Sequence, residues 1–367
     1  MPNSRTFDLA RMTMCAVLWL SCPGRVGWCE DAVVDAEALP ASTLLVTNES
    51  QLHAAARLSA RTDINILVDR LITIRQPVYF PRSNAVVRLI GVTDDAGIHF
   101  DMKFSGDWKS VKAAKHNGLK FNCRQAVIRG LRFSGFEWYG AAIKGHVSSL
   151  LDVSDCDFED IGVMRYSPRV AKPRTADDAI TTQCIAAHRL DGAHVSVVDC
   201  RFRRCALGAY SWSHCLYISA GSVTVVGNRF TNCGNPFAIG GNGSKGTNNI
   251  FGNIVESPGR VVDRNGAERP PYLCKLDDTG RTAFMFNTIS GLYSIPWTGT
   301  PIPSRHIVDF NDYQAMNYAR SWAADTHRGV SASYEQWRRM GFDNHSRPPR
   351  AVSTRHKRNP DRDDGSR

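Results

Sequence analysis

The sequence predicts an all-β fold in which one short structural unit repeats along the chain as a solenoid. Residues 193–206 (AHVSVVDCRFRRCA) and residues 221–234 (GSVTVVGNRFTNCG) carry the same residue, or the same residue type, at almost every position. Each copy alternates apolar and polar residues, is rich in Val and Phe, and is bounded by Gly or Asn, which is typical of short strands. Units of about 25 residues with such strands are characteristic of proteins that stack one coil on the next.

Further copies of the unit occur at unequal intervals, which indicates constant coils joined by loops of variable length. The aligned position expected to lie inside every coil holds Phe133, Phe158, Phe202, Phe230, Val255 and Ile289. Two residues earlier, a second column holds Leu131, Cys156, Cys200, Asn228, Asn253 and Asn287. Amide side chains stacked about 4.8 Å apart can hydrogen-bond along the stack. We therefore expect the second column to form a ladder at a tight turn, with Cys156 and Cys200 as small buried members.

The V-x-V-x-x-[NC]-x-F pattern and its Asn/Cys ladder resemble the right-handed parallel β-helix family of pectate-lyase type. The resemblance covers about residues 60–310. It implies a right-handed parallel β-helix solenoid and an exported protein that acts on a polysaccharide. A β-sandwich with coincidental strand similarity is the alternative fold.

Helices are expected at both ends of the solenoid. Residues 48–60 begin with Asn48 and have Gln51 three positions later, a capping-box pattern. This N-terminal capping helix would cover the open edge of the first coil. Near the other end, Ser333 starts a second capping box, and residues 334–346 (YEQWRRMGFDNHS) resemble a closing motif of exported β-helix proteins that process polysaccharides. In this segment we expect Trp337 to be a packing residue.

The chain is expected to comprise a signal peptide (1–29), a β-helix domain with terminal caps (30–346) and a disordered basic tail (347–367). An apolar run at residues 12–22 follows two arginines and is too short to span a bilayer, which favours export to a secreted or periplasmic location. The net charge of +10 includes +4 in the tail and +2 in the leader, so the body carries only +4. We therefore expect a monomer that binds an acidic glycan, with no nucleic-acid partner and no membrane span.

Cysteine spacing gives no metal site. No C-x-x-C or His-rich pattern occurs, so zinc is not expected. Cys205 and Cys233 occupy one column in neighbouring coils, where an exported protein can join them; the sequence leaves open whether they form a disulfide.

The chemistry is expected on the outward face of the first strand of each coil. If aliphatic residues such as Ile143 and Ile185 point inward, the alternate residues point outward. Two outward columns result, namely Lys144, Ala186, Tyr217, Ala238 and Val262, and His146, His188, Ser219, Gly240 and Arg264. Basic and phenolic groups gather at one end of this face, while Ala and Gly leave room for a ligand.

In the β-helix polysaccharide lyases this face forms the substrate groove, and the resemblance implies the same here. β-Elimination of a uronide needs a base beside the carboxylate and a cation to neutralise it. Lys144, His188 and Tyr217 are the candidate bases or acids, and Arg165 or Arg189 is the candidate neutraliser. Calcium is the alternative neutraliser, and the sequence leaves the cofactor open. Tyr210, Trp212 and Arg264 are candidate substrate-binding residues.

Two other functions remain open. Asp177, Asp178 and His214 resemble the paired Asp and the His motif of polygalacturonases, which are hydrolases. The Asn-Thr-Asp and Arg-Ile-Lys motifs of that family are absent from the expected places, which puts the assignment in doubt. A binding module without catalysis is the other possibility, with Tyr210, Trp212 and Tyr217 as a stacking platform for sugar rings.

Overall fold

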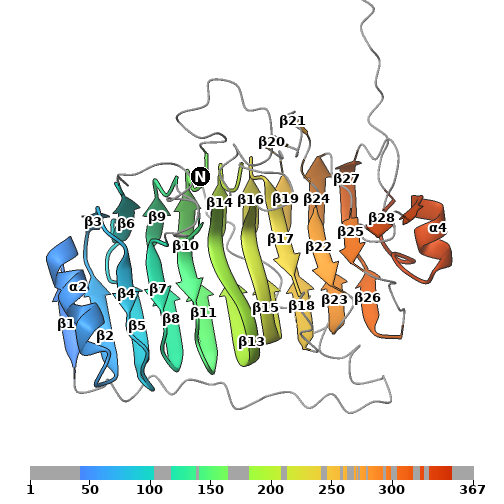
Figure 1. Ribbon diagram of the computed structural model, residues 1–367. Coiled ribbons are helices and arrows are strands. Elements are labelled where there is room, and N and C mark those ends of the chain that lie inside the picture. The colour runs from blue at the N-terminus through green and yellow to red at the C-terminus, as the bar shows by residue number, and fades with distance from the viewer. Residues whose placement is uncertain are drawn as a thin grey trace, which may run out of the picture. The chain divides into compact units, whose positions relative to one another are not determined.

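In the computed structural model the chain forms two units, residues 1–39 and 40–367, and all the residues described here belong to the second. The described residues are 42–102, 117–137, 140–163, 182–207, 213–240, 246–256, 259–262, 268–269, 271, 273–277, 280–291, 295–298, 304–316, 323–325 and 330–348. Parallel strands follow one another in chain order along the molecule (Figure 1). In each successive coil the chain visits three faces in turn.

The first face consists of β4 (Val78–Phe80), β7 (Leu119–Phe121), β10 (Gly140–Gly145), the first halves of β13 (Thr182–Val198) and β15 (His214–Val226), β17 (Asn235–Ile239), β22 (Cys274–Asp277), β25 (Ile295–Thr298) and β28 (Ala323–Asp325). The second face consists of β1 (Thr43–Val46), β2 (Ile64–Val68), β5 (Val86–Gly91), β8 (Gln125–Arg129), β11 (Leu150–Ser154), the second halves of β13 and β15, β18 (Thr247–Phe251), β23 (Arg281–Met285) and β26 (His306–Asp309). The third face consists of β3 (Leu71–Ile74), β6 (Gly97–Phe100), β9 (Arg132–Ser134), β12 (Asp157–Glu159), β14 (Arg201–Arg203), β16 (Arg229–Thr231), β19 (Ile254–Glu256), β24 (Thr288–Gly291) and β27 (Asp312–Met316).

Strands of neighbouring coils pair in parallel on all three faces. Because β13 and β15 continue from the first face into the second, these two faces form one sheet, and the third face is a separate sheet. Antiparallel pairs are formed by β20 (Val261–Val262) with β21 (Glu268–Arg269), and by β28 with β29 (Val330–Ala332). Parallel pairing between consecutive coils agrees with a parallel β-helix-like solenoid, and the β-sandwich alternative is wrong.

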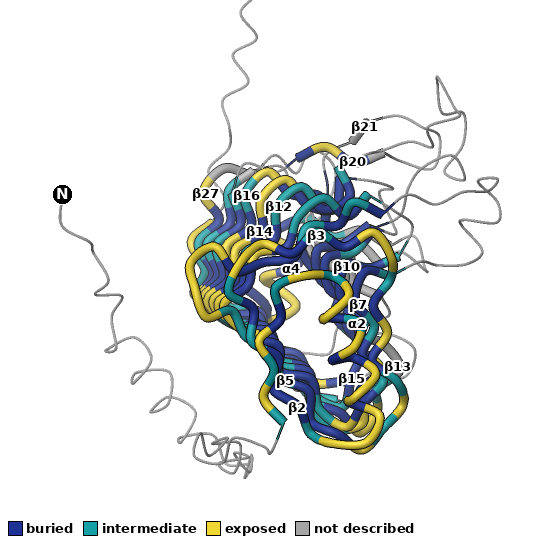
Figure 2. The backbone as a smooth tube through the Cα atoms, turned by 90° about the vertical axis from the view of Figure 1, so that its left-hand side faces the viewer, coloured by how far each residue is buried: buried dark blue, intermediate teal, exposed yellow. Residues whose placement is uncertain are grey.

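The predicted apolar column is confirmed. Phe133, Phe158, Phe202 and Phe230 pair in register on the third face, and Val255 and Ile289 continue the column. The rings of Phe158 and Phe202 stack with centroids 4.8 Å apart, and those of Phe202 and Phe230 stack at 4.6 Å. These side chains are fully buried. Figure 2, a view along the stack, shows buried residues along the strands and exposed residues at the turns.

The Asn ladder is also confirmed, and it is longer than predicted. Asn228, Asn253 and Asn287 are buried, and each donates from Nδ2 to Oδ1 of the asparagine in the next coil at 2.9–3.1 Å. The last acceptor in this series is Asn311, which in turn donates to Asp343 at 3.3 Å. Each amide also donates to a main-chain carbonyl, so the ladder satisfies buried polar groups at the turn.

Both predicted helices are present. In α2 (Glu49–Leu58), Asn48 Oδ1 accepts from Gln51 N at 3.0 Å, whereas Gln51 Oε1 accepts from Thr47 N rather than from the cap residue. In α4 (Tyr334–Arg339), Ser333 and Gln336 form the full capping box. Trp337 is buried, as expected, and stacks on Phe342 with centroids 4.3 Å apart.

The proposed signal peptide at 1–29 lies outside the described residues, as does the chain beyond residue 348. At the end of the described residues, Arg347 N donates to Asn311 O at 2.9 Å. No helix among the described residues has the length and apolarity needed to cross a membrane.

Candidate functional site

Four members of the first predicted outward column share a register position on the first face, but only Lys144 and Tyr217 are partly exposed, whereas Ala186 and Ala238 are buried. Lys144, Ala186, Tyr217 and Ala238 occupy one register position in β10, β13, β15 and β17. The fifth member, Val262, was predicted wrongly: it lies in β20 and pairs antiparallel with Glu268. The coil after β17 places Lys275 of β22 at this position instead. In the other direction the column continues through Lys120 of β7 to Tyr79 of β4.

Alternation along the strands explains why these side chains reach the surface. Ile143 and Gly145, on either side of Lys144, are buried, whereas Lys144 is partly exposed. Leu216 and Ile218 are buried in the same way around the partly exposed Tyr217. Alternation with period two therefore explains the partial exposure of Lys144 and Tyr217.

Lys120, Lys144 and His146 form a cationic cluster at the start of this face. Lys120 and Lys144 are neighbours in register, and Lys120 Nζ lies 5.9 Å from the centroid of the Tyr79 ring. Partial burial of His146, followed by the charges of Lys144 and Lys120, lowers the pKa of its imidazole. His146 follows directly on β10, and the part of its side chain that is not buried is open to solvent. It is therefore uncharged near neutral pH, in reach of solvent, and able to accept a proton.

Tyr217 lies in a second part of the face. It is separated from Lys144 by the coil that carries Ala186, so their main chains are about 10 Å apart at the spacing of two strands. His214 stacks on the Tyr217 ring with centroids 5.8 Å apart and a 21° interplanar angle. His214 is only 1% exposed, so Tyr217 rather than His214 presents a polar group to the surface.

His188 and Arg189 lie at an irregularity in β13. Ala187 pairs with Ile218 and Leu190 pairs with Ala220, so β13 has two residues where β15 has only Ser219. This is the pattern of a β-bulge, which changes the direction of side chains. The strict alternation that assigned His188 to the second outward column does not hold here, and the side chains of His188 and Arg189 are outside the description.

The remaining predicted site residues, Arg165, Asp177, Asp178, Tyr210, Trp212 and Arg264, lie outside the described residues. Two members of the cluster went unassigned in the sequence. Lys120 belongs to "LKF" (119–121), a segment too short for a clear periodic signal. His146 was placed in an outward column but received no role, because its proximity to two lysines depends on pairing between coils.

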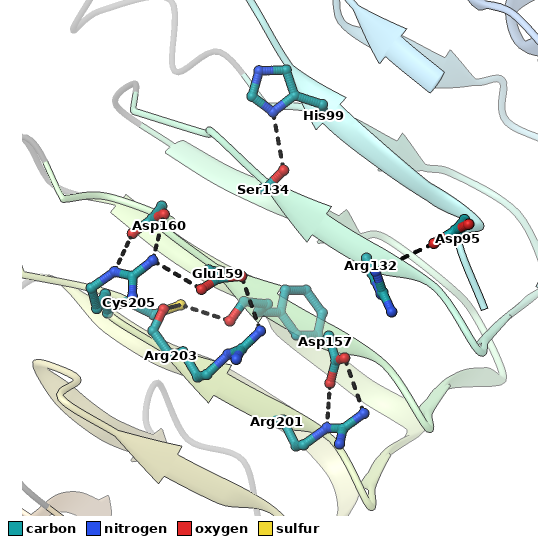
Figure 3. Close-up of polar contacts among 12 residues, drawn as sticks. Asp95, His99, Arg132, Ser134, Asp157, Glu159, Asp160, Arg201, Arg203 and Cys205 are labelled. Atoms are coloured by element: carbon teal, nitrogen blue, oxygen red, sulfur yellow. Dashed lines mark hydrogen bonds and ion pairs between the residues drawn. The ribbon is translucent and has the colours of Figure 1, made fainter. Parts of the chain in front are cut away.

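The third face carries a different arrangement of charge (Figure 3). A cavity of about 290 Å³ lies among Arg132, Asp157, Glu159 and Arg203. Arginines on this face pair with carboxylates, as in Arg201–Asp157 (2.5 Å), Arg203–Glu159 (3.0 Å), Arg204–Asp160 (2.6 Å) and Arg229–Glu256 (2.7 Å). Because the two signs alternate, an acidic polymer would meet carboxylates on this face as often as arginines.

Seven cysteines whose side chains the structure describes carry free thiols, and all seven are buried. Cys184, Cys205, Cys215 and Cys233 form a quartet where the third face turns into the first, each thiol interacting with two others. Cys205 and Cys233 stack as the sequence predicted, but as thiols rather than as a disulfide.

The described residues contain no cluster of three or more His, Cys, Asp or Glu side chains suited to a metal ion. Comparisons with models of protein families, with curated proteins and with solved structures found no match for this chain.

Proposed function

We propose that the protein is an exported polysaccharide lyase that binds a uronic-acid polymer along the first face. The observation that carries this proposal is the cluster of Lys120, Lys144 and His146, in which two ammonium groups lie next to an imidazole of lowered pKa. A uronide places a carboxylate next to an acidic C–H bond, so it needs cations and a base in the same place. On the third face the arginines pair with carboxylates, so charges of both signs alternate there.

The reaction would be a β-elimination. His146 takes the proton from the carbon next to the uronate carboxylate, while Lys120 and Lys144 offset the charge that develops on that carboxylate. The electron pair of the broken C–H bond forms a carbon–carbon double bond, and the bond to the glycosidic oxygen breaks. That oxygen takes a proton from water, and the hydroxide that remains takes the proton from His146. Tyr217, about 10 Å along the face, binds a neighbouring sugar.

The proposal also covers the handedness of the coil and the role of α2. We propose a right-handed coil of the pectate-lyase type and a capping role for α2. The parallel pairing of successive coils and the stacked Asn ladder support the first. The second is supported by Leu52 and Ala55, which α2 buries in the core at the end of the stack where β1 lies (Figure 1).

Hydrolysis and binding without cleavage are the two alternative functions, and the test below distinguishes them. A hydrolase would use Asp177 and Asp178 and would release reducing ends without unsaturated sugars. A binding module would retain the polymer without cleaving it. Calcium is tested as a cofactor by repeating the assay with a chelator.

The deciding experiment incubates the protein with homopolymers of galacturonate, mannuronate and glucuronate. Unsaturated products are followed by ultraviolet absorbance and reducing ends by a colorimetric assay. For Lys120→Ala and Lys144→Ala we expect polymer binding to weaken about tenfold each, and more at low salt than at high salt. Arg61→Ala is the matched control, because it removes an exposed positive charge near α2 and should change neither binding nor cleavage.

The base is identified with three further variants. His146→Ala should lower turnover by about 10²-fold or more while polymer binding is retained. Tyr217→Phe and His188→Ala test two of the three bases expected from the sequence. The same loss of turnover in either variant would assign the proton transfer to that residue. If all three retain full turnover, the proposal for this face is wrong. Arg165→Ala should mainly weaken binding.

A further inference from the structure

The turn between the second and third faces contains two phenylalanines in an unfavourable conformation. At this turn the residue just before the ladder position has a positive φ in seven coils, namely in Gly130, Asp155, Asp199, Gly227, Gly252, Phe286 and Phe310. Gly adopts this region freely and Asp tolerates it, but a bulky residue with φ near 57° is an outlier. Backbone strain of this kind costs at least as much as a stacked aromatic pair returns, so folding alone gives no reason for either phenylalanine.

The two phenylalanines form an exposed stack with His345. The rings of Phe286 and Phe310 are 5.2 Å apart with a 15° interplanar angle, and those of Phe310 and His345 are 4.9 Å apart at 9°. Both phenylalanines are 38% exposed. Asp309 fixes both the main chain and the ring of His345. Asp309 Oδ1 accepts from His345 N, and Asp309 Oδ2 lies 2.7 Å from His345 Nδ1. The stack is therefore held in place before any ligand arrives.

The other end of the stack is open. One coil before Phe286 the position belongs to Gly252, where an added Cβ would meet no atom within 4 Å. One coil further, a Cβ on Gly227 would collide with the carboxylate of Asp199, so this carboxylate lies over Gly227. A space one coil thick thus lies over Gly252, with the Phe286 ring on one side and the Asp199 carboxylate on the other. Because the rings repeat every 4.9–5.2 Å, the next ring of the series would fall in this space.

We propose that the space over Gly252 binds one pyranose ring of a neutral glycan as the next member of the stack. The C–H face of the sugar packs on Phe286, and a hydroxyl donates to the Asp199 carboxylate. Asp155 occupies the same turn in the coil before Asp199, and burial, followed by the charge of Asp155, raises the pKa of Asp199. Two adjacent carboxylates repel a uronate, so this site selects a different sugar from the first face. It does not depend on the proposed lyase activity.

The test measures binding of cellohexaose and of mannohexaose, two neutral probes, by calorimetry on the full chain. Phe286→Gly removes one wall of the space and introduces the residue that the two preceding coils carry at this turn, so the fold should be retained. Gly252→Asn fills the space with a residue that tolerates positive φ. Each change should weaken binding of the preferred neutral hexasaccharide about tenfold.

Controls separate this site from the first face. Val92→Ala shortens an exposed apolar side chain at a distant turn and should leave binding of the neutral probe unchanged. Lys144→Ala should weaken uronate binding only. Equal binding of the neutral probe by wild type, Phe286→Gly and Gly252→Asn would overturn the inference, and so would the absence of neutral-glycan binding in the wild type. A change of oligomeric state in Phe286→Gly without any glycan binding would assign the stack to self-association instead.

Discussion

Asn253 donates from Nδ2 to Asn287 Oδ1 at 2.9 Å, and its own Oδ1 accepts from both the main-chain N and the Nδ2 of Asn228 at 3.0 Å. One buried side chain thus satisfies groups in the coils before and after its own. Its Nδ2 also donates to Val225 O. The contact joins neighbouring coils at the turn where the second face meets the third.

Asn253→Ala should therefore destabilise the fold by about 2–3 kcal/mol, because it leaves buried donors and acceptors without partners. Urea denaturation followed by circular dichroism measures the change. Asn84→Ala, at an exposed turn, is the control and should stay within about 0.5 kcal/mol of wild type. Equal stability of Asn253→Ala and Asn84→Ala would show that the Asn ladder does not stabilise the fold.

Phe202 is the centre of the buried ring column, with stacked neighbours at 4.8 and 4.6 Å. Its replacement by alanine should cost about 3–5 kcal/mol, since the surrounding rings cannot close the cavity. Urea denaturation followed by circular dichroism measures this loss of stability. Phe202→Leu should cost clearly less, and a similar loss in both variants would argue against a cavity as the cause.

The buried thiol quartet should be inert in the native protein. Burial raises the pKa of Cys184, Cys205, Cys215 and Cys233 well above the usual value for a thiol, so no thiolate forms at pH about 8. Peptide mass spectrometry after alkylation should find these residues unmodified in native protein and modified after unfolding. Arg61→Cys supplies an exposed thiol as a positive control. A Cys205–Cys233 disulfide in the unfolded, non-reduced protein would contradict the prediction.

The sequence predicted the parts of this fold that repeat. Phe158, Phe202 and Phe230 recur at one position because the same buried space recurs in every coil, and the asparagines recur because the turn leaves the same main-chain groups unsatisfied. Such constraints are local and leave a periodic signal.

The site could be predicted only in part, because side-chain neighbours on the surface come from different coils. Lys144 and Tyr217 were found from alternation, but Lys120 and Lys275 required the pairing of β7 and β22, which variable loops conceal. Two residues of β13 facing one of β15 also altered the column that contained His188. Nothing in a single strand signals such a bulge.

Asp343 should make stability depend on pH. Burial raises its pKa to about 6, even though Trp337, Tyr313, Ser346 and Asn311 donate to it. Between the unfolded value of 3.8 and about 6, the folded chain binds more protons than the unfolded chain. The stability that protonated Asp343 contributes to the folded state is therefore fully present below pH about 4 and is lost as the pH rises to about 6. The total loss in the free energy of unfolding is on the order of 3 kcal/mol.

The test compares wild type with Asp343→Asn by urea denaturation at several pH values from about 4 to 7. Carboxylates of lowered pKa, such as Asp160 and Glu256, give the opposite slope in both proteins, so only the difference between them reports on Asp343. We expect the stability of wild type relative to the variant to decrease as the pH rises. A difference that is constant with pH would show that Asp343 ionises at its ordinary pKa.

The relation between Lys144 and His146 gives the sharpest test of the first face. The charges of Lys144 and Lys120 oppose protonation of His146, so they keep it in the base form at lower pH. If His146 takes the proton from the uronide, kcat/KM should fall on the acid side with the pKa of His146 in the free protein.

Lys144→Met removes one positive charge while keeping most of the side-chain length. It should move the acid limb to higher pH, toward the ordinary histidine value of about 6.5, in addition to weakening binding. Arg61→Ala should leave the limb where it is. An acid limb that does not move in Lys144→Met would exclude His146 as the base, and the same profile measured for Tyr217→Phe would then show whether the phenol takes that role.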